Sequence, residues 1–418
     1  MLIPVETRAC VSLFANLTIS LRLGTGMRPL HFMRSAFASG LAMFAFGATA
    51  SADPIDYDYL EARIEQLMER EDMMGLGVAV VENGDIRYSK GFGFTEKDGT
   101  PVTNKTRFRW ASVSKGLSGT LAAELEAEGQ LALSSKISDY TTTLKLPGFG
   151  QSKATISDVL SHRLGLVSNA YDNILESGKE PSEIRGILGD LNLICPVSEC
   201  HGYQNVAFDT ISEIFQDVTG QDFDTLVTQK VFRPLGMATA ATTYEGFVGS
   251  SDYAKPYSWR GGKLVRDSIT LPYFRVATAG GISSSIDDLA RYMQAQMGLR
   301  STVFGEHAIR VSHTPVVKTL REARGMGRRF DRIHDADYAL GWRVYDYEGR
   351  TVVGHRGAVR GYRALILFDP ELNTGIVAMW NSNISRPTGL QFELMDMVYG
   401  LEKRDWMRLM PEEPVNGG

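Results

Sequence analysis

Residues 108–115 read Phe108-Arg109-Trp110-Ala111-Ser112-Val113-Ser114-Lys115 and carry the strongest functional pattern in the chain. A short apolar lead-in brings Ser112 to the start of a predicted helix, whose apolar positions continue at Leu117 and Leu121. Ser112 and Lys115 stand three residues apart. One turn of that helix therefore places both side chains on the same face, where they can touch.

The pairing of Ser112 with Lys115 also has a chemical meaning. A serine hydroxyl is a poor nucleophile at its own pKa, and a partly desolvated amine beside it can take its proton. The helix N-terminus adds free backbone N–H groups where an oxyanion would form. The Ser-x-x-Lys pattern occurs once in the chain. By itself it is equally compatible with a serine that caps a helix and a solvated lysine.

Length and composition are those of an ordinary globular protein. The chain has 418 residues, of which 43% are hydrophobic and 22% charged. This is enough for one large domain or two closely packed ones. The net charge of −5 is mild, which argues against nucleic acid as a partner.

Residues 1–52 predict an N-terminal extension and a signal peptide. Residues 33–52 hold a basic start, an apolar core too short to span a bilayer comfortably, and a small-residue cleavage site before Asp53. Translation is then expected to start at Met27 or Met33 rather than Met1. We expect a mature protein that begins near Asp53, is periplasmic or secreted, and keeps no stable membrane anchor. An uncleaved anchor is the alternative.

Cysteine usage fits export. Cys10 lies in the segment expected to be lost, which leaves Cys195 and Cys200 as a pair in an oxidising compartment. We therefore expect a disulfide between these two. A zinc site would need more ligands than His201 can add, so no metal is predicted.

The order of predicted elements indicates the architecture. Strands are expected at 77–81 and 86–90, then again at 338–345, 351–353, 364–368 and 375–380, with a helical region between them. This predicts an α/β (α+β) fold: an antiparallel sheet formed from both chain ends, flanked by helices, with an inserted all-helical lobe over about 117–270. The catalytic domain would cover 53–405, and 406–418 would be a loose tail.

Two further motifs are candidates for the same site as Ser112. Tyr203 and Asn205 follow the expected disulfide loop; a tyrosine beside an ammonium can act as a base, and an asparagine can hold the lysine or bind a substrate carbonyl. Tyr171 begins a similar Tyr-x-Asn pattern. Tyr203 is preferred because a stapled loop would fix it in place. A half-buried structural tyrosine is the alternative.

The other motif is centred on Gly357. A strand ending in glycine leaves its backbone open to a substrate that lies against it like an added strand. The N–H of Ala358 could complete an oxyanion hole with that of Ser112. His355, two residues earlier, is either part of the site or a plain surface histidine.

The three motifs in this order resemble the serine β-lactamase and penicillin-binding-protein-like family, and in particular its class C β-lactamase-related hydrolases. The resemblance covers nearly the whole mature chain. Segments 155–166, 232–237 and 279–281 also look like family segments. The number of residues between Tyr203 and the segment 232–237 is similar to the spacing in the family, which is a second reason to prefer Tyr203 over Tyr171.

The resemblance implies serine acyl transfer without a metal or organic cofactor. Ser112 would attack a carbonyl, Lys115 and Tyr203 would move protons, and the N–H groups of Ser112 and Ala358 would hold the oxyanion. Class C β-lactamases usually have Lys-Thr-Gly as the third motif. His355 at that position resembles the peptidase and esterase members instead. A histidine is only partly charged near neutrality. Unless Arg356 or Arg360 compensates, recognition of the substrate carboxylate should therefore be weaker and β-lactam hydrolysis less efficient.

The expected function is therefore an exported serine hydrolase for a β-lactam, D-amino-acid peptide or ester bond. Its partner would be a small-molecule or cell-wall peptide substrate. A binder that is acylated without turnover is the alternative. A basic run could border the cleft, although a solvated loop is the interpretation we favour. The run comprises Lys318, Arg321, Arg324, Arg328, Arg329 and Arg332.

Overall fold

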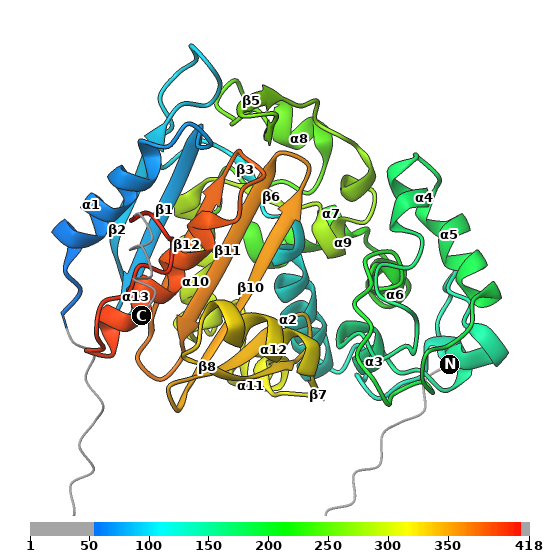
Figure 1. The fold of residues 1–418 in the computed structure, drawn as a ribbon. Helices are drawn as coiled ribbons and strands as arrows, with labels where there is room; N and C mark the ends of the chain where they lie inside the picture. The colour runs from blue at the N-terminus through cyan, green and yellow to red at the C-terminus, as the bar shows by residue number, and fades with distance from the viewer. Residues whose placement is uncertain (1–53, 411–418) are drawn as a thin grey trace, which may run out of the picture. The chain divides into compact units, whose positions relative to one another are not determined.

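A computed structural model describes residues 54–410. Within them, the central element is an eight-stranded antiparallel sheet with the strand order β2, β1, β12, β11, β10, β9, β8, β7 (Figure 1). The first strand therefore pairs with the last, which confirms the sheet predicted from both chain ends. The strands are β1 (Gly75–Glu82), β2 (Asp85–Gly93), β7 (Val317–Lys318), β8 (Ile333–Tyr338), β9 (Arg343–Tyr347), β10 (Arg350–Val359), β11 (Tyr362–Asp369) and β12 (Thr374–Trp380).

Helices cover both faces of the sheet. On one face, α2 (Ser114–Ala127) and α10 (Ile286–Gln296) share a large apolar core with the sheet. On the other face, α1 (Tyr57–Met68) and α13 (Leu390–Val398) form a second core. Alternate residues of β1 and β12 point into the two cores. This is the two-sided burial that near-continuous apolar strands predict.

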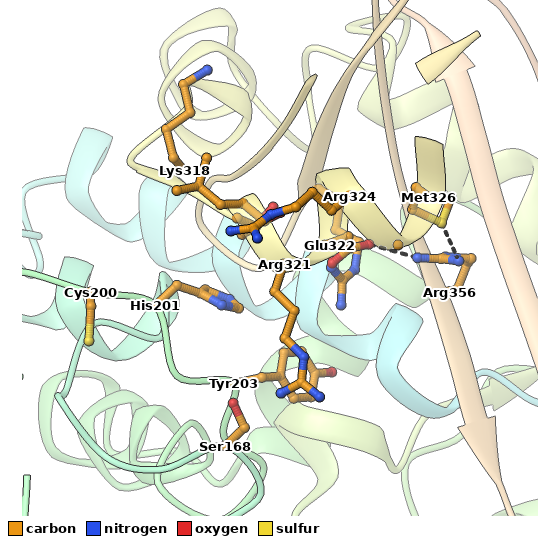
Figure 2. Close-up of a pocket in the computed structure, with 14 residues that line it drawn as sticks. Ser168, Cys200, His201, Tyr203, Lys318, Arg321, Glu322, Arg324, Met326 and Arg356 are labelled. Carbon is orange, nitrogen blue, oxygen red and sulfur yellow. Dashed lines mark hydrogen bonds and ion pairs between the residues drawn. The ribbon is translucent and has the colours of Figure 1, made fainter. Parts of the chain in front are cut away.

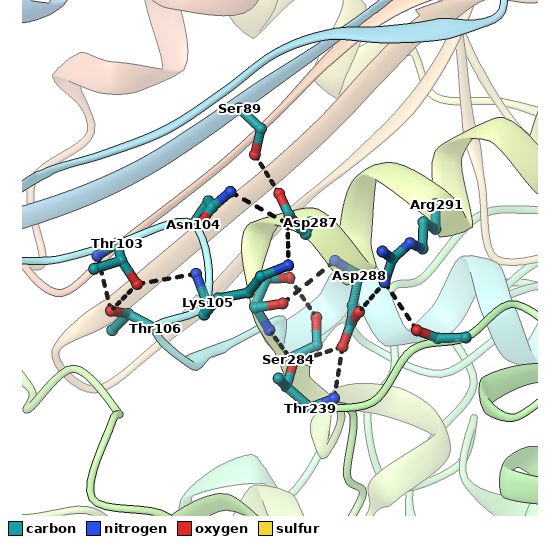
Figure 3. Close-up of polar contacts among 12 residues, drawn as sticks. Ser89, Thr103, Asn104, Lys105, Thr106, Thr239, Ser284, Asp287, Asp288 and Arg291 are labelled. Carbon is teal, nitrogen blue, oxygen red and sulfur yellow. Dashed lines mark hydrogen bonds and ion pairs between the residues drawn. The ribbon is translucent and has the colours of Figure 1, made fainter.

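The N-terminus of α10 is fixed to the sheet through Asp287. Its carboxylate accepts hydrogen bonds from Ser89 on β2 and from Asn104 Nδ2 at 3.3 Å, and it pairs with Lys105 (Figure 3). An acid in the first turn is favourable because the N-terminal end of a helix is positive. The short strand β6 (Ser283–Ser284), directly before α10, is thereby held in place beside the segment that leads to Ser112.

The lobe predicted at about 117–270 is mostly helical but not entirely so. β4 (Tyr257–Arg260) and β5 (Lys263–Arg266) form a small hairpin within it. Gly261 and Gly262 both have positive φ angles, 57° and 73°, which suits a two-residue turn. The helices between α2 and α10 are α3 (Ile156–Leu160), α4 (Asp172–Glu176), α5 (Pro181–Ile187), α6 (Thr210–Thr219), α7 (Phe223–Val227), α8 (Tyr244–Val248) and α9 (Ala277–Gly280).

The single strand predicted over 338–345 is wrong. β8 ends at Tyr338 and β9 begins at Arg343, so the chain turns between them. Gly341 has a φ of 76°, and a Cβ there would lie 2.1 Å from the carbonyl oxygen of Lys115. The turn thus packs directly against α2, a tertiary contact that local alternation of apolar residues does not reveal.

Trp406 and Met407, predicted as the start of a loose tail, are held in the fold. Met407 is fully buried in the second core, and its backbone N–H donates to Glu393 at 3.0 Å. The Trp406 indole donates to Asp396 at 2.7 Å. The predicted signal peptide, Cys10 and residues 411–418 lie outside the described part of the chain. Of the helices that the structure describes, none combines the length and hydropathy needed to span a bilayer.

Candidate active site

The turn that carries Ser112 is tightly held. Residues Ala111–Val113 form a 3-10 turn that leads straight into α2. Ala111 has a φ of 48°, in the left-handed region that non-glycine residues seldom adopt. Just before it, the Trp110 N–H donates to Ile282 O at 2.9 Å. Ser112 is half-buried whereas its neighbours in the turn are buried. The hydroxyl therefore sits at the accessible point of a fixed turn.

Gly357 on β10 lies directly against this turn. A Cβ at this position would come within 2.1 Å of Trp110 O and 3.1 Å of Ser112 N. Contacts below 3.0 Å to backbone atoms cannot be relieved by side-chain motion, so only glycine fits here. The glycine that the sequence places in the substrate strand is thus also the residue that lets this strand approach the serine.

Next to Gly357, one edge of β10 is open. β11 pairs with β10 as far as Val359, whereas β9 pairs with it only as far as Gly354. Within the described sheet, residues 355–359 therefore have no strand on the β9 side. Ala358 is exposed there. An extended substrate could add to this edge, next to the predicted oxyanion donors of Ser112 and Ala358.

Lys115 is fully buried beneath the site. Within the described residues its ammonium donates to Asn205 Oδ1 at 2.7 Å and to Ala279 O at 2.8 Å, rather than to Ser112. Its Nζ lies 4.8 Å from the centre of the Tyr203 ring. A buried ammonium requires such acceptors. The structure therefore brings Lys115, Asn205 and Tyr203 together, as the motifs predict.

Asp172 extends this group and was not predicted as a site residue. The Asn205 amide donates to Asp172 Oδ2 at 2.6 Å, so its nitrogen faces the acid and its oxygen faces Lys115. Burial raises the pKa of Asp172 above its ordinary value of 3.8, although the Asn205 hydrogen bond and the Lys115 charge act in the opposite direction. Asp172 follows Tyr171, the competing tyrosine, and no motif in the sequence marks it as a site residue.

Tyr203 is positioned by its neighbours in the chain. Its carbonyl accepts from the Asn169 N–H at 2.7 Å, and the preceding Gly202 N–H donates to His162 O at 2.9 Å. The predicted disulfide between Cys195 and Cys200 is present, with the Cα atoms 6.2 Å apart. The disulfide is therefore present as predicted, and these two hydrogen bonds hold the same loop in addition to it.

A buried relay of three rings runs beside Tyr203. Tyr338 Oη lies 3.1 Å from His162 Nε2 and 3.0 Å from His355 Nε2. His162 Nδ1 accepts from the Gln204 N–H at 3.2 Å, so Nε2 must carry the proton and donate to Tyr338. Tyr338 then donates to His355, whose Nδ1 proton goes to Arg356 O at 2.9 Å. Every member of the relay is neutral and paired.

His355 therefore does not have either role considered from the sequence. It is 2% exposed, and both ring nitrogens are occupied within the protein, so it is neither a surface histidine nor free to bind a substrate carboxylate. Burial, with the nearby charges of Arg343 and Lys115, holds the pKa of His355 well below its ordinary value. Its neutral ring links β10 to β8 beneath the site.

A cavity of about 670 Å³ opens beside Tyr203 (Figure 2). Lys318, Arg321 and Arg324 of the basic run line it, and most of the run is helical, since residues Leu320–Arg329 form α12. The preference for a solvated loop was therefore wrong. The cavity is lined by Ser168, Cys200, His201, Tyr203, Lys318, Thr319, Leu320, Arg321, Glu322, Arg324, Gly325, Met326, Arg343 and Arg356.

The sequence matches known proteins over most of its length. The family model for Beta-lactamase covers residues 60–395. The "Unguisins hydrolase ungD'" of Aspergillus campestris is 24% identical over 369 residues, which are 83% of this chain and 66% of that protein. The "Protein flp" of Staphylococcus aureus (strain COL) is 24% identical over 331 residues, 78% and 63% respectively. The chain thus spans slightly less than two thirds of these relatives.

Solved structures share the fold. The octameric penicillin-binding protein homologue from Pyrococcus abyssi superposes with a TM-score of 0.74 at 24% identity, covering 84% of this chain and 78% of that one. EstCE1, a hydrolase with promiscuous acyltransferase activity, gives 0.68 at 17%, covering 82% and 98%. A class C beta-lactamase gives 0.65 at 21%, also covering 82% and 98%. On the family match over residues 60–395 and this shared fold, the chain belongs to the beta-lactamase family and has its serine hydrolase fold.

Proposed function

We propose that this protein is an exported serine hydrolase that forms an acyl-enzyme on Ser112 and cleaves an ester or peptide bond. The observation that supports this most strongly is the combination of an accessible serine with a buried, doubly bonded lysine. Ser112 is half-buried on a fixed turn. Lys115 is held one helical turn later by Asn205 and Ala279.

Each group has a defined part in the proposed reaction. The substrate carbonyl carbon lies at Ser112 Oγ, and the Lys115–Tyr203 pair takes the hydroxyl proton as the new C–O bond forms. The carbonyl electron pair moves onto its oxygen, which the N–H groups of Ser112 and Ala358 bind. When the bond to the leaving group breaks, that group keeps the electron pair and receives the proton from Tyr203. Water then releases the acyl group by the reverse sequence.

The third motif favours esters or peptides over β-lactams as substrates. A lysine at the His355 position would offer a fixed cation beside the open edge of β10. His355 is instead neutral and turned into the relay with Tyr338. Without that cation, we expect β-lactams to be turned over slowly.

Export is supported by the disulfide. Structural disulfides are rare in reducing compartments, and Cys195 and Cys200 are joined here. N-terminal sequencing of the protein purified from separate cell fractions tests the proposal. We expect a periplasmic or secreted chain that begins near Asp53. A cytoplasmic chain that retains residues 33–52 would contradict it.

The acyl-enzyme is tested with Ser112→Ala. We expect the variant to lose both turnover of p-nitrophenyl acetate and covalent labelling by a fluorophosphonate, measured by intact-protein mass. Ser134→Ala is the matched control, because Ser134 is exposed and does not line the cavity beside Tyr203. It should keep both. Labelling that persists in Ser112→Ala would disprove the assignment, and a stoichiometric burst without further turnover would instead identify a binder.

A further inference from the structure

The cavity beside Tyr203 is strongly positive although the chain as a whole is negative. Five cationic side chains line it, and Glu322 is the one acid among the lining residues. The net charge of the whole chain is −5. Such a concentration of positive charge in a concave site attracts anions and raises their local concentration. The cations are Lys318, Arg321, Arg324, Arg343 and Arg356.

Three of these cations already have acidic partners. Lys318 pairs with Asp335 and with Asp337 on β8. Arg356 Nη2 lies 2.7 Å from Glu322 Oε1, and Arg343 contacts the other oxygen of the same carboxylate. The Tyr345 hydroxyl also donates to Glu322, at 2.7 Å. Glu322 therefore neutralises the floor of the cavity and anchors α12 to the sheet.

Arg321 and Arg324 are the two cations left over. Both are exposed on α12, and neither has an ion pair with any residue in the described part of the chain. They stand three positions apart and so share one face of the helix, the face that looks onto the cavity (Figure 2). Arg328 is exposed on the same helix but does not line the cavity. Two guanidinium groups thus remain free to bind an external anion, which arginine does well with carboxylates.

The position of Tyr203 identifies the part of the substrate that would enter. In the proposed reaction Tyr203 gives its proton to the leaving group, so the leaving group must lie at the Tyr203 hydroxyl. Tyr203 lines this cavity. The acyl part instead lies along the open edge of β10 near Ala358. The anion site and the leaving-group site are therefore the same cavity.

We propose that Arg321 and Arg324 bind a carboxylate on the leaving group, so that the enzyme prefers substrates with an anionic leaving group. This inference rests on the proposed function, because the acyl-enzyme reaction defines which side is the leaving group. No new covalent step is involved.

A matched pair of esters tests this preference. 4-Acetoxybenzoate and its methyl ester share the acetyl group and differ in the charge of the leaving phenol. We expect kcat/KM to be higher for 4-acetoxybenzoate. In the double variant Arg321→Gln, Arg324→Gln, the ratio of the two kcat/KM values should fall about tenfold, mainly through KM. Arg328→Gln is the matched control and should leave the ratio unchanged.

Two outcomes would overturn the proposal: a wild-type preference for the methyl ester, or a ratio that the double variant does not change. A binding measurement separates this proposal from the proposed function. Titration of 4-acetoxybenzoate into Ser112→Ala protein by calorimetry reports binding without turnover. If wild-type protein hydrolyses neither ester, the proposed function fails. Binding that the two glutamine substitutions weaken about tenfold would still support the anion site, and equal binding would refute it.

Discussion

Lys115 and the arginines of α12 are cations near Tyr203, and they are held in opposite ways. Lys115 is fully buried, with two neutral acceptors within 2.8 Å. Arg321 and Arg324 are exposed and have no acidic partner among the described residues. Two hydrogen bonds fix the position of a buried ammonium, and proton transfer requires such a fixed position. An exposed arginine side chain can adopt many conformations, but its charge still attracts an anionic substrate from a distance.

The comparison also separates two kinds of sensitivity. Removing a group from the buried side should change kcat, because the position of reacting atoms is lost there. Removing a group from the exposed side should change KM, because only substrate attraction is lost there. The following predictions test this division.

The largest effect is expected from Lys115→Ala. The rate should fall on the order of 10³-fold or more in kcat, because groups that act as a unit fail together. Stopped-flow measurement of p-nitrophenyl acetate acylation provides the test, and circular dichroism verifies the fold. Lys136→Ala, which removes a surface lysine that donates to Lys153 O, is the control. A loss of only a few-fold would mean that proton transfer uses another group.

The next effect is expected from Asp172→Asn. The acid holds the Asn205 amide with its oxygen toward Lys115. An asparagine at position 172 would allow that amide to turn, and a misplacement of about 1 Å can cost ~100-fold in rate. We therefore expect kcat to fall 10- to 100-fold with KM little changed.

A pH profile shows whether Asp172 acts as a positioning residue. Its pKa is raised by burial, so the wild-type rate should fall as the acid becomes protonated at low pH. The Asp172→Asn variant should lack this part of the profile. If the variant keeps the wild-type profile and rate, the orientation of Asn205 does not depend on Asp172.

The sequence predicted the part of the site that local pattern encodes. Ser112 and Lys115 lie one helical turn apart, and Gly357 is needed where β10 meets that turn, so short motifs carry this information. The hairpin of β1 and β2 was equally clear, since Asn83 and Gly84 both adopt positive φ angles in its turn.

What could not be predicted depends on contacts between distant segments. His355 differs from a surface histidine because it is buried and its Nε2 accepts a hydrogen bond from Tyr338, which lies on another strand. Asp172 joins the site only through Asn205, 33 residues away. α12 buries a single residue, Met326, so little apolar signal marks it in the sequence, and Glu322 fixes the helix through arginines on β9 and β10. None of these contacts has a periodic signal in the sequence.

The folded protein should become less stable in acid because of the histidines buried near the site. Burial lowers the pKa of His201 from 6.5 to about 4 and holds those of His162 and His355 well below 6.5. In the unfolded chain these rings gain protons near pH 6.5, whereas in the folded protein they do not. The stabilisation is therefore complete above pH 6.5 and is lost as the pH falls toward 4.

Melting temperatures between pH 7.5 and 4 test this prediction. They should fall steadily below pH 6.5. His201→Gln should reduce the slope, because the His201 Nε2 has no hydrogen-bond partner among the described residues and little else is lost. His334→Gln is the control, since His334 is exposed on β8. Equal slopes in wild type and His201→Gln would show that other groups cause the acid sensitivity.

The smallest effect on catalysis is expected from the double variant Cys195→Ser, Cys200→Ser. The closed loop is short, so the disulfide contributes only ~2 kcal/mol to stability on the chain-entropy estimate. Tyr203 is also held by hydrogen bonds to Asn169 and, through Gly202, to His162. We therefore expect a melting temperature lower by a few degrees and a kcat within about threefold of wild type. A kcat that falls as far as in Asp172→Asn would mean that the disulfide, and not these hydrogen bonds, places the Tyr203 hydroxyl.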